Sequence, residues 1–346
     1  MTPIRELLGV ELPILQAPMA GVQGSALAIA VSSAGGLGAL PCAMLSAEQM
    51  RAELAAIRAG TNKPFHVNFF CHTTPEPDAA REAAWRAALR PYYEEFSIDA
   101  ADSGGGRSRA PFSAEAADVL DEFRPAVVSF HFGLPDAGLM ARAKATGCRI
   151  LASATTADEA RWLEARGVDA VIAQGFEAGG HRGMFLSEDV GTQMGTLALV
   201  PQIVKAVRVP VIAAGGIADG QGVAAALVLG AAAVQVGTAY LLCPEAATSA
   251  VHRAALKSEA ARHTALTRLF SGRPARGIVN RLMRELGPMS EIAPTFPLAA
   301  AALAPLRAKA ESQGDGGFSP LWCGQNASGC SGVGAGELTR RLAGMR

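Results

Sequence analysis

Cysteine is scarce in this sequence and is not arranged for metal binding. The 346 residues include six cysteines with no Cys-x-x-Cys pair, and no His-Glu-x-x-His motif or cluster of histidines with carboxylates is present. Structural zinc sites and disulfide frameworks both depend on such spacings. We therefore expect no bound metal, and we interpret the cysteines as buried or incidental thiols.

An excess of charge of either sign is also absent. Lys and Arg together number 31, Asp and Glu together number 31, and the formal net charge is zero. Nucleic acids and anionic membrane surfaces are bound largely through excess positive charge. The balance argues against either as the main partner and favours a small-molecule ligand.

Long uncharged apolar segments of helical character are missing as well. The first twenty residues carry Arg5, Glu6 and Glu11, which interrupt any secretory apolar core. Half of the residues are hydrophobic, which is enough to form a substantial core. These features predict a cytoplasmic protein without a membrane partner, and they allow a homodimer without specifying one.

What the sequence does contain is an alternation of short apolar runs and longer helical stretches. Eight runs rich in Val, Ile and Ala are the expected strands, at 13–17, 37–40, 65–69, 126–130, 149–152, 170–173, 209–213 and 233–236. Runs such as PVIAAGG are continuously hydrophobic, as strands covered on both faces should be. The helical stretches 157–166 and 221–229 are followed by Gly167 and Gly230, which suit helix ends.

Eight such units predict an α/β fold, a (β/α)8 TIM barrel. An open doubly wound sheet is the competing arrangement, and the absence of a G-x-G-x-x-G motif after the first strand weakens its dinucleotide-binding form. We assign the barrel to residues 1–240, with an insertion at about 71–125 that contains a helix and a mobile glycine-serine loop at 103–108. Residues 241–320 are expected to form an additional, mainly helical substrate-binding region or lid, and residues 321–346 a segment that packs back on the barrel.

Glycine-rich loops follow the seventh and eighth expected strands, with the sequences AGGIADG at 214–220 and QVGT at 235–238. Glycine lets backbone N–H groups approach a phosphate closely, and TIM barrels often bind phosphate in these two loops. Each loop alone is equally well explained as a simple turn. Because no Walker motif is present, a cofactor with one terminal phosphate, such as FMN, suits the pair of loops better than a nucleoside triphosphate.

Three other expected strands end in side chains that suit a flat cofactor. Met19 follows the first strand and offers a polarisable side chain, although filling the core is the alternative role for a lone methionine. Asn68 and Gln174 end the third and sixth strands, and each amide could donate and accept hydrogen bonds at the edge of a flavin.

Two of the six histidines, His131 and His181, fall where strands end at the predicted barrel mouth. Two imidazoles there could serve as a proton acceptor and as an electrostatic anchor for an anionic substrate. The remaining four lie in a strand, in the insertion or in surface-like helices, where we expect satisfied or solvated rings: His66, His72, His252 and His263. In the loop QGFEAGGHRG at 174–183, we expect Glu177 to order the turn or to pair with Arg182 rather than to act as a base.

Seven segments together resemble class I nitronate monooxygenases: QAPMAG at 16–21, VSFHFG at 128–133, QGFEAGGHRG at 174–183, TLALVPQ at 196–202, AAGGIADG at 213–220, QVGTAYLLCPE at 235–245 and SGRPARG at 271–277. The resemblance covers nearly the whole chain. It implies a TIM barrel that binds FMN, His181 as the catalytic histidine and His131 beside the flavin. The cofactor-binding positions that it implies are Met19, Asn68, Gln174, Gly179, Gly180, Gly215, Gly216, Gln235, Val236, Gly237 and Thr238.

The same resemblance implies the reaction. Members of this family oxidise alkyl nitronates, such as propionate 3-nitronate, with O₂ to a carbonyl compound and nitrite, and we expect one-electron transfer from the nitronate to the flavin. The alternative is an FMN-dependent NAD(P)H oxidoreductase of the enoyl-[acyl-carrier-protein] reductase or quinone reductase type, which has similar EAGGH and AAGGIADG loops. A protein that binds FMN without catalysis is a third interpretation, which the two mouth histidines disfavour.

Overall fold

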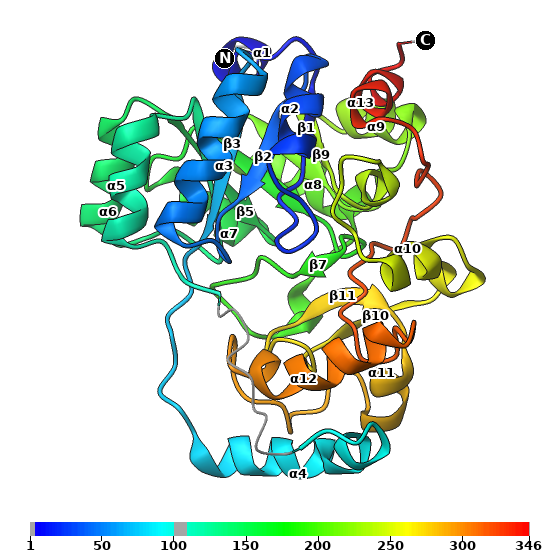
Figure 1. Cartoon of the computed structure of the whole chain (residues 1–346). Helices are drawn as coiled ribbons and strands as arrows, with labels where there is room; N and C mark the ends of the chain where they lie inside the picture. The colour runs from blue at the N-terminus through cyan, green and yellow to red at the C-terminus, as the bar shows by residue number, and fades with distance from the viewer. Residues whose placement is uncertain (1–3, 100–108, 346) are drawn as a thin grey trace.

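The computed structural model describes residues 4–99 and 109–345. Eight parallel strands form one sheet in the order β1-β9-β8-β6-β5-β4-β3-β2 (Figure 1). They correspond one to one with the eight expected strands, and their bounds are β1 Ile14–Gln16, β2 Gly38–Pro41, β3 Phe65–Phe70, β4 Val127–His131, β5 Arg149–Ala154, β6 Ala170–Gln174, β8 Val211–Ala214 and β9 Ala233–Val236.

The two edge strands of this sheet meet and close it into a barrel. Leu15 in β1 forms a parallel bridge with Leu37, the residue before β2. The Gln16 N–H donates to the Leu37 carbonyl at 2.9 Å, and the Leu37 N–H donates to the Ile14 carbonyl at 2.9 Å. The predicted (β/α)8 barrel is therefore confirmed, and the open doubly wound sheet is excluded.

Helices surround the barrel, and several of them begin at capping residues or end before glycines, as the sequence predicts. Ser46 caps its helix through a reciprocal pair of hydrogen bonds with Gln49. Gly167 and Gly230 follow two other helices with φ of +75° and +97°, a conformation that favours glycine. The helices packed around the strands are α2 Ser25–Ser33, α3 Ala47–Gly60, α5 Ala114–Phe123, α6 Ala137–Ala145, α7 Ala157–Glu164, α8 Thr196–Ala206 and α9 Gly220–Val228.

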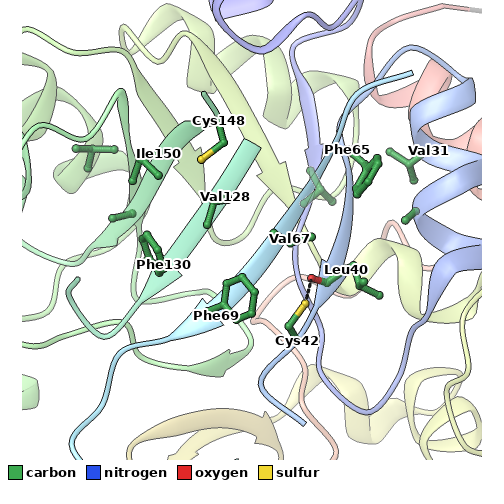
Figure 2. Close-up of a cluster of buried hydrophobic side chains, with 14 of the residues drawn as sticks. Val31, Leu40, Cys42, Phe65, Val67, Phe69, Val128, Phe130, Cys148 and Ile150 are labelled. Carbon is green, nitrogen blue, oxygen red and sulfur yellow. Dashed lines mark hydrogen bonds between the residues drawn. The ribbon is translucent and has the colours of Figure 1, made fainter. Parts of the chain in front are cut away.

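Successive side chains of each strand point alternately to the helices and to the barrel interior. Figure 2 shows Val67, Phe69, Val128 and Phe130 on the outward side of β3 and β4, within the core shared with the helices. The inward side near the amino ends is a separate apolar core that includes Leu151, Ile172 and Ile212, and the short helix α1 (Ile4–Leu8) covers it with two of its side chains. The polar side chains that point into the barrel therefore lie near the carboxyl ends of the strands.

A second layer lies below the carboxyl ends of the strands in the view of Figure 1. Its elements come from the long β3–β4 connection, from the β6–α8 loop and from the chain after β9. They are α4 Ala79–Glu95, β7 Gly180–His181, α10 Ala250–Leu256, β10 Thr264–Thr267, β11 Ala275–Ile278, α11 Arg281–Leu286 and α12 Ala299–Ser312, with short 3₁₀ turns η1 Val190–Thr192 and η3 Glu259–Arg262. The 3₁₀ turn η2 Thr238–Leu242 follows β9 directly, and its Ala239 and Tyr240 pack in the barrel core.

Helix α4 leaves the barrel and packs on α12. Trp85 in α4 is fully buried, and its indole N–H donates to the Ala299 carbonyl at 3.1 Å, while Glu95 pairs with Arg281 at 2.6 Å. Only part of the expected insertion behaves in this way, because residues 114–123 form the barrel helix α5, whose apolar side chains belong to the core around the strands. The expected glycine-serine loop at 103–108 lies outside the described residues.

The last helix of the described chain packs on the barrel. Helix α13 (Ala335–Leu342) buries Leu338 and Leu342 in the barrel core. The hydroxyl oxygens of Tyr240 and Thr339 lie 2.8 Å apart and share a hydrogen bond. The domain boundaries at 240 and 320 stay predictions. Among the described residues, every helix is too short or too polar to cross a bilayer.

Candidate active site

A cavity, partly open to solvent, lies at the carboxyl ends of the barrel strands. Its described lining contains no Asp, Glu or Lys, and Arg109 is its one residue with a permanent charge. Twelve of the thirteen residues predicted to form the site line it: Met19, Asn68, His131, Gln174, Gly179, Gly180, His181, Gly215, Gly216, Gln235, Gly237 and Thr238.

Val236 is the exception. It directly follows Gln235 in β9, so alternation turns its side chain outward, where it is 1% exposed in the core shared with the helices. Its side chain therefore does not face the cavity. A contact between its backbone and the cofactor stays a prediction.

The glycine loops present free backbone donors to this cavity. Within the described part of the chain, the N–H groups of residues 215–218 and of Gly237 have no acceptor. Gly215 and Gly216 have φ of +116° and +71°, which exposes backbone where a side chain would be strained. Unpaired N–H groups are costly when buried, and a phosphate would satisfy several at once.

The polar side chains of the cavity differ in how much hydrogen-bonding capacity they keep. The Asn68 amide donates to the Ser129 hydroxyl at 2.9 Å, and no described residue donates to its Oδ1 atom. Gln235 Oε1 is buried without a partner. The Gln174 amide donates to the His181 carbonyl at 2.9 Å and accepts from the Gly183 N–H at 2.7 Å, so it braces the loop. One Nε2 hydrogen stays available, and a contact of Gln174 with the cofactor stays a prediction.

His181 does not end a barrel strand. It lies in the two-residue strand β7, which pairs antiparallel with β11 so that His181 lies opposite Ala275. The neighbouring Arg182 N–H donates to the Pro274 carbonyl at 2.9 Å, which fixes the same register. The position of the His181 ring over the cavity therefore depends on a segment about ninety residues later in the chain.

Arg182 and Glu177 both stabilise this loop, but each does so through partners of its own. Arg182 is fully buried, and its guanidinium donates to the Gly175 carbonyl at 2.7 Å, the Gln174 carbonyl at 2.8 Å and Gln193 Oε1 at 2.9 Å. The Glu177 carboxylate accepts from the Thr196 N–H at 2.8 Å. The expected role of Glu177 in ordering the turn is confirmed. The expected Glu177–Arg182 pair is absent among the described contacts, since carbonyl groups satisfy the arginine.

Serine hydroxyls orient the two mouth histidines. His181 Nε2 lies 2.9 Å from Ser271 Oγ, and His131 Nδ1 lies 3.0 Å from Ser153 Oγ. His131 Nε2 lies 3.3 Å from the His181 carbonyl oxygen, so it donates there as the Nε2–H tautomer. No described residue is a partner for His181 Nδ1, which leaves that nitrogen for a ligand.

Both rings are neutral in the folded protein. Burial lowers the pKa of His131 to about 3, with Arg273 adding to the effect. Burial also lowers the pKa of His181 well below its usual value, and the nearby Arg109 and His131 lower it further. With both rings uncharged, the permanent cation of the described cavity lining is Arg109. The roles expected of His131 and His181 stay predictions.

The buried histidines predict a pH-dependent stability. Burial lowers the pKa of His66 to about 4 and that of His252 to about 4, against 6.5 for an exposed ring. Because the unfolded chain binds these protons first, stability is fully present above about pH 6.5 and falls as the pH approaches 4, by about 1.4 kcal/mol per pH unit for each such histidine. The urea midpoint should therefore drop between about pH 7 and pH 5.

A His66→Gln variant should show a shallower drop than the wild type, because it removes one titrating group. His263 is exposed, so a His263→Gln variant is the matched control and should keep the wild-type slope. A midpoint that stays constant over this pH range would contradict the neutral state of the buried rings.

Two histidines that the sequence seemed to place on the outside are buried. His252 lines the cavity, with Nε2 3.1 Å from the Trp322 carbonyl oxygen. His72 is 7% exposed, and its ring lies 4.7 Å from that of Phe296. Spacing could not reveal either position, because the layer that buries both rings is formed by distant segments.

Residues 322–330, the 322–330 strap, cross the rim of the cavity. The Gly324 N–H donates to Thr238 Oγ1 at 2.9 Å, and the Asn326 amide donates to the Gly216 carbonyl at 3.0 Å. A Cβ at Gly179 would lie 2.5 Å from the Gly324 nitrogen, so the strap needs glycine at that point of the loop. At its start, the Trp322 ring lies 5.6 Å from the His181 ring.

Comparison with known proteins agrees with this arrangement. A family model described as nitronate monooxygenase matches residues 1–343. A nitronate monooxygenase of Pseudomonas aeruginosa is 45% identical over 342 residues, which cover 97% of this chain and 96% of that protein. The crystal structure of a nitroalkane oxidase from Streptomyces ansochromogenes is 41% identical with a TM-score of 0.89, covering 99% of this chain and 97% of the other.

A more distant structure, FabK from Thermotoga maritima, is 28% identical with a TM-score of 0.73 and covers 99% of this chain and 94% of its own. The nearer relatives share the fold over almost their full length, and the family model spans the barrel, the loop that carries His181 and the 322–330 strap. On these grounds, the chain belongs to the nitronate monooxygenase family, which is in general flavin-dependent.

Proposed function

We propose that the protein oxidises alkyl nitronates with O₂ to carbonyl compounds and nitrite, with FMN as the bound flavin and propionate 3-nitronate among its substrates. Family membership supports the reaction class. The observation that carries the assignment of the site is the neutral His181 ring, fixed over a cavity whose glycine loops offer unpaired N–H groups.

The residues of the cavity fit FMN. The free N–H groups at Gly216 and Gly237 suit the terminal phosphate, and the unpartnered oxygens of Asn68 and Gln235 suit the hydrogen-bonding edge of the ring. Met19 lies beside Gly237, where its sulfur would be 3.7 Å from an added Cβ, and it would lie along the ring. The bound flavin would supply the redox chemistry by accepting one electron from the nitronate.

His181 would act through its free Nδ1 atom. When Ser271 donates to Nε2, Nδ1 carries the hydrogen and donates to a nitronate oxygen. When Nε2–H donates to Ser271 instead, Nδ1 is a base that removes a proton from a neutral nitroalkane. A neutral ring can exist in either tautomer, so the lowered pKa of His181 suits both roles.

The remaining residues keep the reacting groups in place. Ser153 and the His181 carbonyl fix the His131 ring, and Phe132 packs on that ring with centroids 4.5 Å apart. The ring of Phe296 lies 5.3 Å from that of His181. These aromatic contacts exclude water beside the imidazoles, which strengthens the hydrogen bonds made to the substrate.

One assay tests the proposal directly. The purified yellow protein is mixed with propionate 3-nitronate, and O₂ consumption and nitrite release are followed together. Turnover with nitrite as a product is the expected result. A protein that binds FMN but consumes no O₂ with any alkyl nitronate would disprove the function, and the cytoplasmic location that we also propose is tested separately by cell fractionation.

The NAD(P)H oxidoreductase remains the second candidate, because FabK shares the fold at 28% identity. Anaerobic addition of NADH separates the two. The proposed monooxygenase should keep its oxidised flavin absorbance for minutes, and immediate bleaching of the flavin would favour the reductase.

A further inference from the structure

Arg109 is the one cation in the cavity lining, and nothing in the proposed chemistry has yet used it. Among the described residues, no carboxylate pairs with its guanidinium, and the lining itself holds no Asp or Glu. An arginine that is partly buried normally has an anionic or carbonyl partner. Within residues 4–99 and 109–345, Arg109 therefore has no anionic partner.

Hydrogen bonds made by the residues that follow Arg109 fix this segment at the barrel mouth. The Ala110 N–H donates to the Ala43 carbonyl at 2.9 Å, and the Phe112 N–H donates to the Phe70 carbonyl at 2.8 Å. Pro111 also forms a parallel bridge with Phe70, the last residue of β3. Arg109 is thus part of the ordered rim.

Arg109 and His181 line the same cavity at the carboxyl ends of the strands. Asn68 lies opposite Ser129 in the inner layer of the β3–β4 pair, and Phe70 lies opposite His131 one layer further out. The bridge from Phe70 to Pro111 keeps Arg109 close to this part of the barrel mouth. Arg109 also lies near enough to His181 to affect its electrostatics, so the far end of a nitronate bound at His181 could reach Arg109 within the same cavity.

The positive charges near Arg109 favour an anion in this part of the cavity. Arg307 in α12 is close enough to repel Arg109, and together with burial it lowers the pKa of Arg109 to about 10. Arg307 is paired with Glu311 at 2.7 Å, whereas no carboxylate of the described chain pairs with Arg109. An anionic group between His181 and the outer rim would pair with Arg109 and relieve the repulsion.

We propose that Arg109 binds the carboxylate of nitronates that carry a second anionic group, and that it sets a preference for them over alkyl nitronates with uncharged tails. This inference rests on the proposed nitronate oxidation, because it assigns the far end of the same substrate. Arg109 is a specificity residue and takes no part in bond breaking. The nitronate group itself is bound at His181 and the flavin.

The test compares two substrates of similar length, propionate 3-nitronate and butyl 1-nitronate, in three variants. Arg109→Met removes the charge, and Arg109→Lys keeps the charge without the fork of N–H donors. Arg90→Met is the matched control, since Arg90 is exposed on α4 and its contact with Glu94 is long, at 3.8 Å. For each protein, kcat/KM is measured by O₂ uptake, and the ratio of the two values is the readout.

In Arg109→Met, the ratio of kcat/KM for propionate 3-nitronate to that for butyl 1-nitronate should fall about 100-fold, the usual scale for losing one partner of a desolvated charge pair. Arg109→Lys should lose about tenfold or less, and Arg90→Met should keep the wild-type ratio. An unchanged ratio in Arg109→Met would overturn the proposal. A parallel fall for both substrates would also overturn it, because Arg109 would then bind the nitronate group or support the fold.

A binding experiment tests the role of Arg109 without requiring the protein to oxidise a nitronate. Succinate and butyrate are titrated into the FMN-loaded protein, and the dissociation constants are obtained from the change in the flavin spectrum. Wild type should bind succinate more tightly than butyrate, and Arg109→Met should lose that difference. If wild type oxidises neither nitronate, the proposed function fails, and the succinate preference still decides the role of Arg109.

Discussion

A His181→Asn variant should retain FMN and lose about 100-fold in kcat/KM for propionate 3-nitronate. The loss follows because asparagine has no counterpart of the Nε2 atom that Ser271 orients, and because it removes the ring that contacts Phe296 and Trp322. With a neutral nitroalkane, the loss should approach about 10,000-fold, since that substrate also needs a base. The measurement is O₂ uptake with both substrates, with FMN content taken from the visible spectrum.

The comparison between substrates separates the two roles of His181. Equal losses would assign the residue to binding alone, whereas a larger loss with the nitroalkane assigns proton removal to it. His263→Asn is the control, because His263 is exposed and lies outside the cavity lining. If His181→Asn kept FMN and oxidised the nitronate at the wild-type rate, its catalytic role would be refuted.

A Gly216→Val variant should bind FMN at least about 100-fold more weakly. Gly216 has φ of +71°, and a Cβ there would lie 3.3 Å from the Glu177 Cβ, so valine must shift the loop. The shift moves N–H groups that we assign to the phosphate and disturbs the Asn326 contact with the Gly216 carbonyl. Titration of the apoprotein with FMN, followed by flavin fluorescence, gives the dissociation constant.

Gly147 provides the matched control for that experiment. Its φ is +84°, so valine there incurs a similar backbone strain, but no other atoms lie within 4 Å of the added Cβ. Gly147 joins α6 to β5, away from the cavity lining. Gly147→Val should lower stability without weakening FMN binding, and equal FMN affinity in the two variants would refute the phosphate assignment.

The barrel was predictable because its strands are covered on both faces. Such strands leave uninterrupted apolar runs, and the glycines at helix ends separate one βα unit from the next, as Gly167 and Gly230 do. The position of α5 was not predictable in the same way. Its helical pattern is clear, but only the core around Phe112 and Leu120 shows that this part of the β3–β4 connection belongs to the barrel.

The candidate site was predictable where it depends on strand ends and not where it depends on distant pairing. Asn68 and Gln235 follow from their places in the strands, and alternation along β9 would have excluded the Val236 side chain. The partners of His181 could not be deduced locally, since Ser271 and β11 lie ninety residues away. Ser129 and Ser153 carried a usable signal, because they are polar residues on the inward side of otherwise apolar strands.

Charge was the least predictable property of the site. Arg182 looked like a surface residue in a glycine-rich loop, yet it is fully buried against carbonyl groups. Arg109 lies between a polar segment and a proline, and nothing in its neighbours distinguishes it from an ordinary loop arginine. Whether an arginine faces solvent or a cavity is decided by elements that approach it from elsewhere in the chain.

The 322–330 strap imposes an order on the maturation of the protein. All eight barrel strands are synthesised by residue 236, but the contacts of Gly324 and Asn326 with the cofactor loops form only after the ribosome has added almost ninety more residues. A nascent chain with all eight strands therefore still lacks these contacts at the loops that we assign to the phosphate. We expect stable binding of the flavin only after the strap has been synthesised, so chains stalled on the ribosome before residue 322 should lack the cofactor.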